Sequence, residues 1–253
     1  MQSEQTAAEK SVSSNEEKNG RKLTKRTITA SFLILVLVPL TIFLSWKYGE
    51  RRFYLTSLLI IVYSMMPFFL VFEKRKPKAR ELVVLAVLCA IAAGGRAAFV
   101  MLNHFKPLVA VVIITGISFG PEAGFMCGAV SGFVSNFIAG QGPWTPWQMF
   151  SFGIAGFLAG VFYQKGLLKK ENRIGLCIFG GLCTQLVVGV LLDLCALFTM
   201  GSVISWEMYL TLLISGLPVN AVHAAATVFF LFIISKPMFE KIDRIKIKYG
   251  MLE

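Results

Sequence analysis

The chain alternates long apolar runs with short polar or basic segments, and this pattern predicts a series of membrane helices. A hydrocarbon core about 30 Å thick needs about twenty apolar residues per helix. Eight runs meet or approach that length. They are residues 27–46, 53–72, 80–102, 107–119, 121–140, 147–164, 174–200 and 209–235. The pattern therefore predicts an all-α polytopic membrane protein.

The fourth span is shorter than the others and lies almost directly against the fifth. Only the sequence Phe119-Gly120-Pro121-Glu122 separates them. Because glycine and proline end one helix and allow the next to begin, we expect a tight helical hairpin at one surface. The length of residues 107–119 leaves open whether this span crosses the bilayer completely.

Basic residues indicate how the spans are oriented. Most of the 25 Lys and Arg residues lie in four clusters between or beyond the apolar runs. The clusters are Lys18–Arg26, Lys74–Arg80, Lys165–Arg173 and Lys236–Lys248. With eight spans all four fall on one side, which the positive-inside rule assigns to the cytoplasm. Both termini are then cytoplasmic, and the net charge of +11 needs no nucleic-acid partner.

Composition divides the chain into four parts. Residues 1–26 are polar and nearly free of large apolar side chains, so we expect a disordered cytoplasmic tail. Residues 27–72 form an apolar leader of two transmembrane helices. A basic linker containing Pro77 separates it from a six-helix core, residues 80–235, in which small and polar residues concentrate. Residues 236–253 form a basic cytoplasmic tail.

Composition and missing motifs exclude several classes of function. With 56% hydrophobic and 15% charged residues, the chain would expose too much apolar surface in water. Its five cysteines lie inside apolar runs and form no Cys-x-x-Cys, and no cluster has metal-ligand spacing. No P-loop occurs. We therefore expect no metal, no directly bound cofactor and no ATPase site of its own, so the chain is not predicted to be an enzyme.

The segment from residue 140 to 148 reads Gly-Gln-Gly-Pro-Trp-Thr-Pro-Trp-Gln. The stiff turn carries two aromatic and two amide side chains, which are typical of an aromatic-lined ligand pocket. An aromatic belt at the membrane interface is the alternative for the tryptophans. The alternative explains the glutamines poorly, so Gln141, Trp144, Trp147 and Gln148 are candidate substrate-binding residues.

A stripe of small residues precedes this segment. Gly124, Gly128, Gly132, Asn136 and Gly140 recur four residues apart, which places them on one face of the fifth span. The glycines indicate close helix packing. Asn136, near the end that leads into the tryptophan segment, is a further candidate ligand contact.

Polar residues inside the other spans are candidates because charges in lipid are costly. Arg96 and Asp193 should face the bundle interior, a water-filled cavity or each other. Asn220 and His223 lie three residues apart after Pro218, on one helix face. They form either a hydrogen-bonded core pair or a substrate contact.

Two further pairs belong to the third span. Asn103 and His104 lie at its outer end, where they line either an entrance or a solvated loop. Ala86 and Ala90 begin a stripe of small residues that continues toward Ala97. Spacing alone favours internal helix packing for this stripe.

From Ala86 onward the sequence resembles the substrate-binding S components of energy-coupling factor (ECF) transporters. Four segments carry the resemblance: Ala86–Ala90, Gly95-Arg96, Phe119–Gly124 and, above all, Gly140–Met149. The resemblance covers the six-helix core. The two helices predicted within residues 27–72 are additional to the usual six, and their role is unassigned.

The resemblance implies a division of labour. An S component of this bacterial cell-membrane family captures a vitamin or related micronutrient from outside, and a membrane-embedded T component with two cytoplasmic ATPases supplies the energy from ATP. It implies that Ala86 and Ala90 contact the T component. It also implies that the outer loops, residues 103–106, 141–148 and 201–207, close over the substrate. The tryptophan segment looks like that of cobalamin-type members, although thiamine, pantothenate, folate or a deazapurine precursor are alternatives.

Two other classes of function compete with this reading. One is a proton-coupled secondary transporter that uses Arg96, Asp193 and His223. The other is a membrane scaffold without a ligand. Uptake that survives loss of the T component but stops with an uncoupler would favour the secondary transporter. The absence of any copurifying small molecule would favour the scaffold.

Overall fold

The computed structural model describes residues 36, 40, 79–200 and 205–250. The predicted polar tail, nearly all of the two-helix leader and most of residues 201–207 lie outside this part. Every regular element within the described residues is helical. In chain order they are α5 (Ala79–Ala98), α6 (Leu108–Phe119), α7 (Pro121–Ala139), α8 (Thr145–Gln164), α9 (Arg173–Cys183), η2 (Thr184–Gly189), α10 (Val190–Met200) and α11 (Trp206–Lys248).

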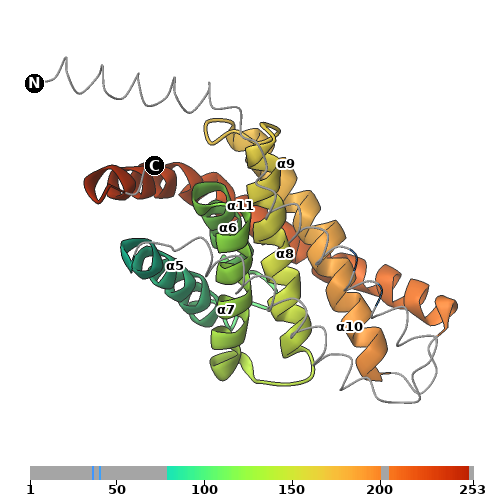
Figure 1. The fold of residues 1–253 in the computed structure, drawn as a ribbon. Coiled ribbons are helices and arrows are strands. Elements are labelled where there is room, and N and C mark those ends of the chain that lie inside the picture. Colours follow the sequence, from blue (N-terminus) through green and yellow to red (C-terminus); the bar gives the residue numbers. More distant parts are fainter. Residues whose placement is uncertain (1–35, 37–39, 41–78, 201–204, 251–253) are drawn as a thin grey trace, which may run out of the picture.

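Helix α6 forms the centre of the bundle (Figure 1). All twelve of its residues are buried, and it packs against α5, α7, α8 and α11. Its sequence contains no charged residue, so no face of the helix requires water. At 1.5 Å per residue it is about 18 Å long, shorter than a hydrocarbon core of about 30 Å. The fourth predicted span is therefore a short central helix.

The predicted hairpin between the fourth and fifth spans is confirmed. Gly120 alone separates α6 from α7, and its φ of 101° lies in the region that favours glycine. Pro121 is the first residue of α7, where its fixed φ suits a helix and its missing N–H costs nothing.

Helices α7 and α8 pack with their backbones in close contact along the predicted glycine stripe. A Cβ atom on Gly124 would lie 2.5 Å from the carbonyl oxygen of Gly156, and one on Gly156 would lie 2.6 Å from the carbonyl carbon of Gly124. Real Cβ atoms do not approach backbone so closely. The stripe therefore sets the spacing of α7 and α8, and residues at its end are held in a fixed position.

The predicted span 174–200 is one continuous helix with an irregular centre. Residues Thr184–Gly189 form a π-helical turn between α9 and α10. At the end of this turn Gly189 lies against α11, where a Cβ atom would be 2.6 Å from Cγ of Asn220. Turns of this kind are common near functional sites.

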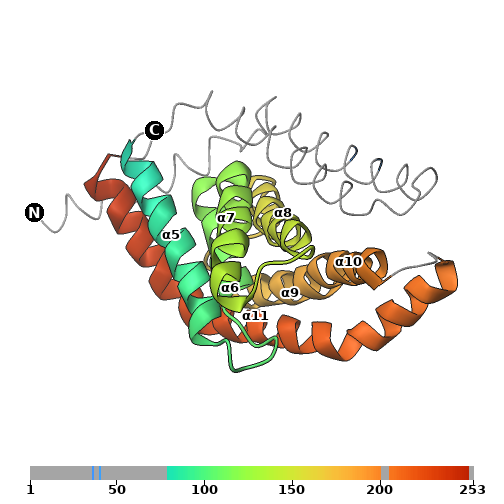
Figure 2. The same cartoon turned by 90° about the horizontal axis from the view of Figure 1, so that it is seen from below.

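Helix α11 is the longest element, with 43 residues, or about 64 Å at 1.5 Å per residue. Figure 2 shows its N-terminal half along α9 and α10 and its C-terminal half along α5. The Nδ2 of Asn220 donates to Oδ2 of Asp193 in α10, whereas Phe230 packs against Phe99 just after α5. This helix therefore joins the two sides of the bundle.

The helix continues beyond residue 235, the end predicted from the sequence. Residues assigned to a basic tail extend it to Lys248. Phe239 and Ile242, each 4% exposed, pack this extension against the core. Lys170 pairs with Asp243 at 2.9 Å, and Nζ of Lys246 donates to the carbonyl oxygen of Ser118. The sequence prediction missed this apolar face because basic residues surround it.

By length and composition, three of the described helices could cross a membrane. They are Ala79–Ala98, Arg173–Thr199 and Trp206–Lys248. The all-helical membrane architecture is confirmed at this level. The number of crossings and the cytoplasmic location of both termini stay predictions.

Candidate functional site

A cluster of five polar side chains lies where the end of α5 meets the end of α7 and the start of α8. We call it the amide cluster: Arg96, Ser135, Asn136, Thr145 and Gln148. Nη1 of Arg96 donates to Oγ of Ser135 and to Oδ1 of Asn136, each at 2.7 Å. Its Nη2 donates to Oε1 of Gln148 at 3.1 Å. Three predicted site residues, Arg96, Asn136 and Gln148, are thus brought together.

Asn136 is the centre of this cluster and is 1% exposed. Its Nδ2 donates to Oε1 of Gln148 at 2.9 Å and to Oγ1 of Thr145 at 3.0 Å. With its Oδ1 bonded to Arg96, both ends of the amide have partners. Buried polar groups require such partners, because a buried donor or acceptor without a hydrogen bond costs about 1–3 kcal/mol. The cluster is therefore a hydrogen-bonded network that satisfies the buried amide of Asn136.

The turn that follows α7 is tied to the cluster through Thr145. The Thr145 hydroxyl donates to Oε1 of Gln141 at 2.9 Å and accepts from the backbone N–H of Gly142 at 3.1 Å. Nε2 of Gln141 donates to the carbonyl oxygen of Phe133 at 3.2 Å. Gln141 itself is exposed. A movement of this turn must therefore break contacts with the amide cluster.

The two predicted tryptophans occupy different environments. Trp147 is 1% exposed and its ring stacks on Phe198 of α10, with centroids 5.6 Å apart. Trp144 is 43% exposed, and its Nε1 donates to the carbonyl oxygen of Gly140 at 3.4 Å. Only Trp144 presents its ring to solvent, whereas the ring of Trp147 packs α8 against α10.

Phe152 connects the amide cluster to α11. The guanidinium of Arg96 lies 5.7 Å from the centroid of its ring. His223, buried in α11, meets the same ring edge-on, with centroids 6.2 Å apart. Arg96 and His223 are therefore separated by one aromatic ring, although they lie far apart in the sequence.

Arg96 and Asp193 do not pair within the described structure. Arg96 is 8% exposed and faces the bundle interior, one of the three environments predicted for it. Asp193 instead accepts from Asn220 at 2.8 Å, and a Cβ atom on Gly216 would lie 2.6 Å from its Oδ1. Asn220 is thus bonded to Asp193 and not to His223, so the predicted alternative of a hydrogen-bonded Asn220–His223 pair is wrong.

Asn103 and His104 lie in the connection between α5 and α6, and both are exposed. His104 has a φ of 60°, which is uncommon for a residue other than glycine. The connection is anchored by Phe105, whose ring centroid lies 5.5 Å from that of Phe230. Neither Asn103 nor His104 joins the amide cluster, and a role at an entrance stays a prediction.

Ala86 and Ala90 are exposed on α5. Beside them on the same helix, Val83 and Val87 are 63% and 52% exposed. The stripe therefore does not pack inside the described part of the bundle, contrary to the expectation from spacing alone. Its role as a docking face stays a prediction.

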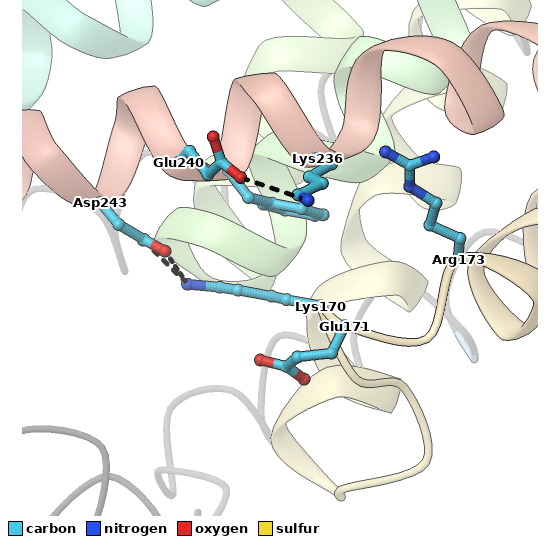
Figure 3. Close-up of a pocket in the computed structure, with 7 residues that line it drawn as sticks. Lys170, Glu171, Arg173, Lys236, Glu240 and Asp243 are labelled. Atoms are coloured by element: carbon cyan, nitrogen blue, oxygen red, sulfur yellow. Dashed lines mark hydrogen bonds and ion pairs between the residues drawn. The ribbon is translucent and has the colours of Figure 1, made fainter. Parts of the chain in front are cut away.

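An open pocket of about 530 Å³ lies elsewhere, between the segment before α9 and the C-terminal half of α11 (Figure 3). We call it the charged pocket. Its lining residues are Lys170, Glu171, Arg173, Lys236, Phe239, Glu240 and Asp243. Lys170 pairs with Asp243 at 2.9 Å, and Lys236 faces Glu240 at 4.0 Å. None of the predicted site residues lines this pocket.

Sequence reasoning missed three members of the site region: Ser135, Thr145 and Phe152. Ser135 precedes Asn136 directly, and Phe152 follows Gln148 by one helical turn. Their positions beside predicted residues were the available signal. Within the described residues, no group of three or more metal-ligating side chains comes together.

Comparison with known proteins gives a consistent result. A sequence model of the family described as "ECF transporter, substrate-specific component" matches residues 80–235, which is more than half of the chain. The match coincides with the predicted six-helix core.

Curated relatives match over a shorter region. A UPF0397 protein of Aliivibrio salmonicida (strain LFI1238) is 34% identical over 103 residues, 39% of this chain and 55% of that protein. A UPF0397 protein of Vibrio atlanticus (strain LGP32) is 36% identical over 101 residues, 38% of this chain and 53% of that protein. The chain thus spans about half the length of the curated relatives it matches. No solved structure matches it.

Proposed function

The chain belongs to the family of ECF transporter substrate-specific components, and from this premise we propose that it binds a vitamin or related micronutrient on the outer side of the bacterial cell membrane. It then passes this substrate to a T component driven by two ATPases. As a member of this family it is a membrane transport subunit and not an enzyme. ATP acts only through the partner subunits. Both termini lie in the cytoplasm in this proposal.

The amide cluster is the observation that carries the proposal. Arg96, Asn136 and Gln148 come from three helices and hydrogen-bond to one another in a chain whose other helix contacts are mainly apolar. A charged network in such an interior is costly to build and is retained where a ligand needs it. The exposed ring of Trp144 lies in the adjoining turn.

We place the substrate above the amide cluster, between the turn at residues 140–144 and the connection at 99–107. Trp144 offers an aromatic face, and Gln141 and Gln148 offer amides. Aromatic surface with a few polar groups suits a bulky organic cofactor. Among vitamins we favour a cobalamin-like compound, on the resemblance of the tryptophan segment.

The exposed Ala86–Ala90 stripe is the proposed face for the T component. Its two methyl groups lie four residues apart on α5, so a partner helix could pack against them at short range. Leucine at both positions would fill that space. Because the stripe is exposed in the described structure, the substitution leaves the buried packing of α5 unchanged.

The test measures uptake in cells that also produce the T component and both ATPases. We expect Ala86→Leu with Ala90→Leu to abolish copurification with the T component and ATP-dependent uptake, while the isolated subunit stays folded. Val83→Leu with Val87→Leu is the matched control on the neighbouring exposed stripe and should keep both. Normal uptake by the alanine double variant would contradict the docking face.

The energy source decides between the proposal and proton-coupled transport. An inactive ATPase subunit should stop uptake in the proposed mechanism. Uptake that survives this change but stops with an uncoupler would instead support a secondary transporter.

A further inference from the structure

Arg96 is a buried cation that makes no ion pair within the described residues. It is 8% exposed. Its three hydrogen-bond acceptors, Ser135, Asn136 and Gln148, are all neutral. An isolated charge in an apolar interior is costly, and neutral dipoles offset only part of that cost.

The guanidinium of Arg96 also has N–H donors beyond those used in these three hydrogen bonds. Arginine carries five N–H groups in a planar fork. Three hydrogen bonds from its Nη1 and Nη2 are present. The remaining donors suit a carboxylate or phosphate, which the fork of arginine binds with two parallel hydrogen bonds.

Lys106 adds a second positive charge to this region. Pro107 packs directly on α5, because a Cβ atom on Gly95 would lie 2.7 Å from its Cγ. This contact brings the neighbouring Lys106 toward Arg96. Burial lowers the pKa of Lys106, and the positive charge of Arg96 lowers it further.

Among the described residues, no carboxylate forms an ion pair with Arg96 or Lys106. In the part of the chain that the structure describes, Lys106 makes no ion pair, and Asp193 is bonded to Asn220 instead. A concentration of unneutralised positive charge attracts anions. Within the cluster Gln148 keeps partial surface exposure, whereas Ser135 and Asn136 do not, and the neighbouring Gln141 is exposed. An anion would therefore approach Arg96 from the side of Gln148.

Resting on the proposed function, we propose that the substrate carries an anionic group, a carboxylate or a phosphate, which Arg96 binds with support from Lys106. On binding, the anion supplies the countercharge that the described residues do not provide. Arg96 would thereby select acidic micronutrients over neutral ones of similar size.

The test uses the purified full chain in phosphatidylcholine nanodiscs at pH 7. The probes are sodium acetate and sodium phosphate, each compared with sodium chloride at equal ionic strength. An anion that binds only the folded state raises the unfolding midpoint, and its apparent affinity follows from the concentration dependence. We expect acetate, phosphate or both to raise the midpoint of the wild type. Acetate alone would indicate a carboxylate, and phosphate alone a phosphate ester.

Substitutions locate the site. Arg96→Gln should weaken the apparent affinity by about tenfold or more, the loss of a charge-assisted hydrogen bond. Lys106→Gln should weaken it less, because this side chain is only half-buried. Lys236→Gln removes an exposed cation of the charged pocket and should leave the affinity unchanged. A repeat in phosphatidylglycerol nanodiscs separates a lipid headgroup from a free anion, since a bound headgroup would abolish the response to added anions.

The inference is overturned if neither anion stabilises the wild type, or if Arg96→Gln responds as the wild type does. If Arg96→Gln does not fold, an unchanged affinity in Lys106→Gln counts against the site. A transported substrate without an acidic group would overturn this inference and leave the proposed function intact. Stabilisation by anions without ATP-dependent uptake would overturn the proposed function and leave the anion site intact.

Discussion

The amide cluster holds a single buried guanidinium among neutral partners, whereas the charged pocket holds its cations against carboxylates. Arg96 contacts amides and a hydroxyl. Lys170 and Lys236 each face an acid from α11. Among the described residues, carboxylates face Lys170 and Lys236 but none pairs with Arg96. The difference supports the proposal that the cluster binds an anionic ligand, whereas the ion pairs of the pocket join two segments of the protein.

The charged pocket has open volume, but its described lining residues include no buried charge without a countercharge. The charged pocket offers about 530 Å³ (Figure 3), but its ion pairs are partly solvated, with Asp243 42% and Lys236 67% exposed. Exposed pairs contribute about 0–1 kcal/mol each. Burial and missing countercharge are therefore better guides to function here than space.

The largest effect is expected from Trp147→Ala, which removes the aromatic contact between α8 and α10. The Trp147 ring is fully buried against Phe198. Truncation of a buried tryptophan costs about 3–5 kcal/mol in the free energy of unfolding. Denaturant unfolding in detergent measures it. A cost below about 1 kcal/mol would show that the ring does not stabilise the packing of α8 on α10.

A second variant converts the cluster into a copy of the charged pocket. Asn136→Asp places a carboxylate of similar shape 2.7 Å from Nη1 of Arg96, which supplies the missing countercharge internally. We expect folding to be retained and substrate binding to weaken by about 1.5–3 kcal/mol, the range for hydrogen bonds to charged groups.

Gln141→Glu is the charge-matched control for this variant, because it adds the same charge on the exposed turn beside the cluster. Its effect on substrate affinity should be smaller than that of Asn136→Asp. Equal losses in the two variants would indicate a general charge effect and not neutralisation of Arg96.

Trp144→Ala separates ligand binding from packing. Its ring is partly exposed and makes one long hydrogen bond, so we expect little change in unfolding. Substrate affinity should fall by about 1–3 kcal/mol if the ring covers the ligand. Unchanged affinity would place this tryptophan in an interfacial aromatic belt.

The smallest effect is expected at the charged pocket. In a double-mutant cycle, Lys170→Gln and Asp243→Asn should show a coupling below about 1 kcal/mol in unfolding, because Asp243 is substantially exposed. Neither change should alter substrate affinity. Loss of binding in either variant would contradict the assignment of function to the amide cluster.

Hydrophobic periodicity and the positions of glycine and proline were sufficient to predict the local architecture. The apolar runs predicted the helices, Gly120 and Pro121 predicted the hairpin, and the four-residue glycine spacing predicted close helix packing. The structure shows that α8 is the partner of this stripe. Each prediction depends on residues close together in the sequence. The extension of α11 was missed because Phe239 and Ile242 are embedded in a basic segment.

The candidate site could be predicted only in part. Arg96, Asn136 and Gln148 were proposed for separate reasons, and their hydrogen bonds depend on how three helices meet. The different burial of Trp144 and Trp147 could not be read from a segment in which both look alike. The sequence also left open that Arg96 and Asp193 neutralise each other, because it does not show which faces of α5 and α10 are turned together.

Mass spectrometry of the small molecules released by the denatured, purified protein tests the central claim most directly. Wild-type protein should release one organic compound in near-stoichiometric amount, and Asn136→Asp, purified at the same yield, should release little or none. The absence of any compound from the wild type, or equal release from both proteins, would contradict a substrate-binding subunit whose site is the amide cluster.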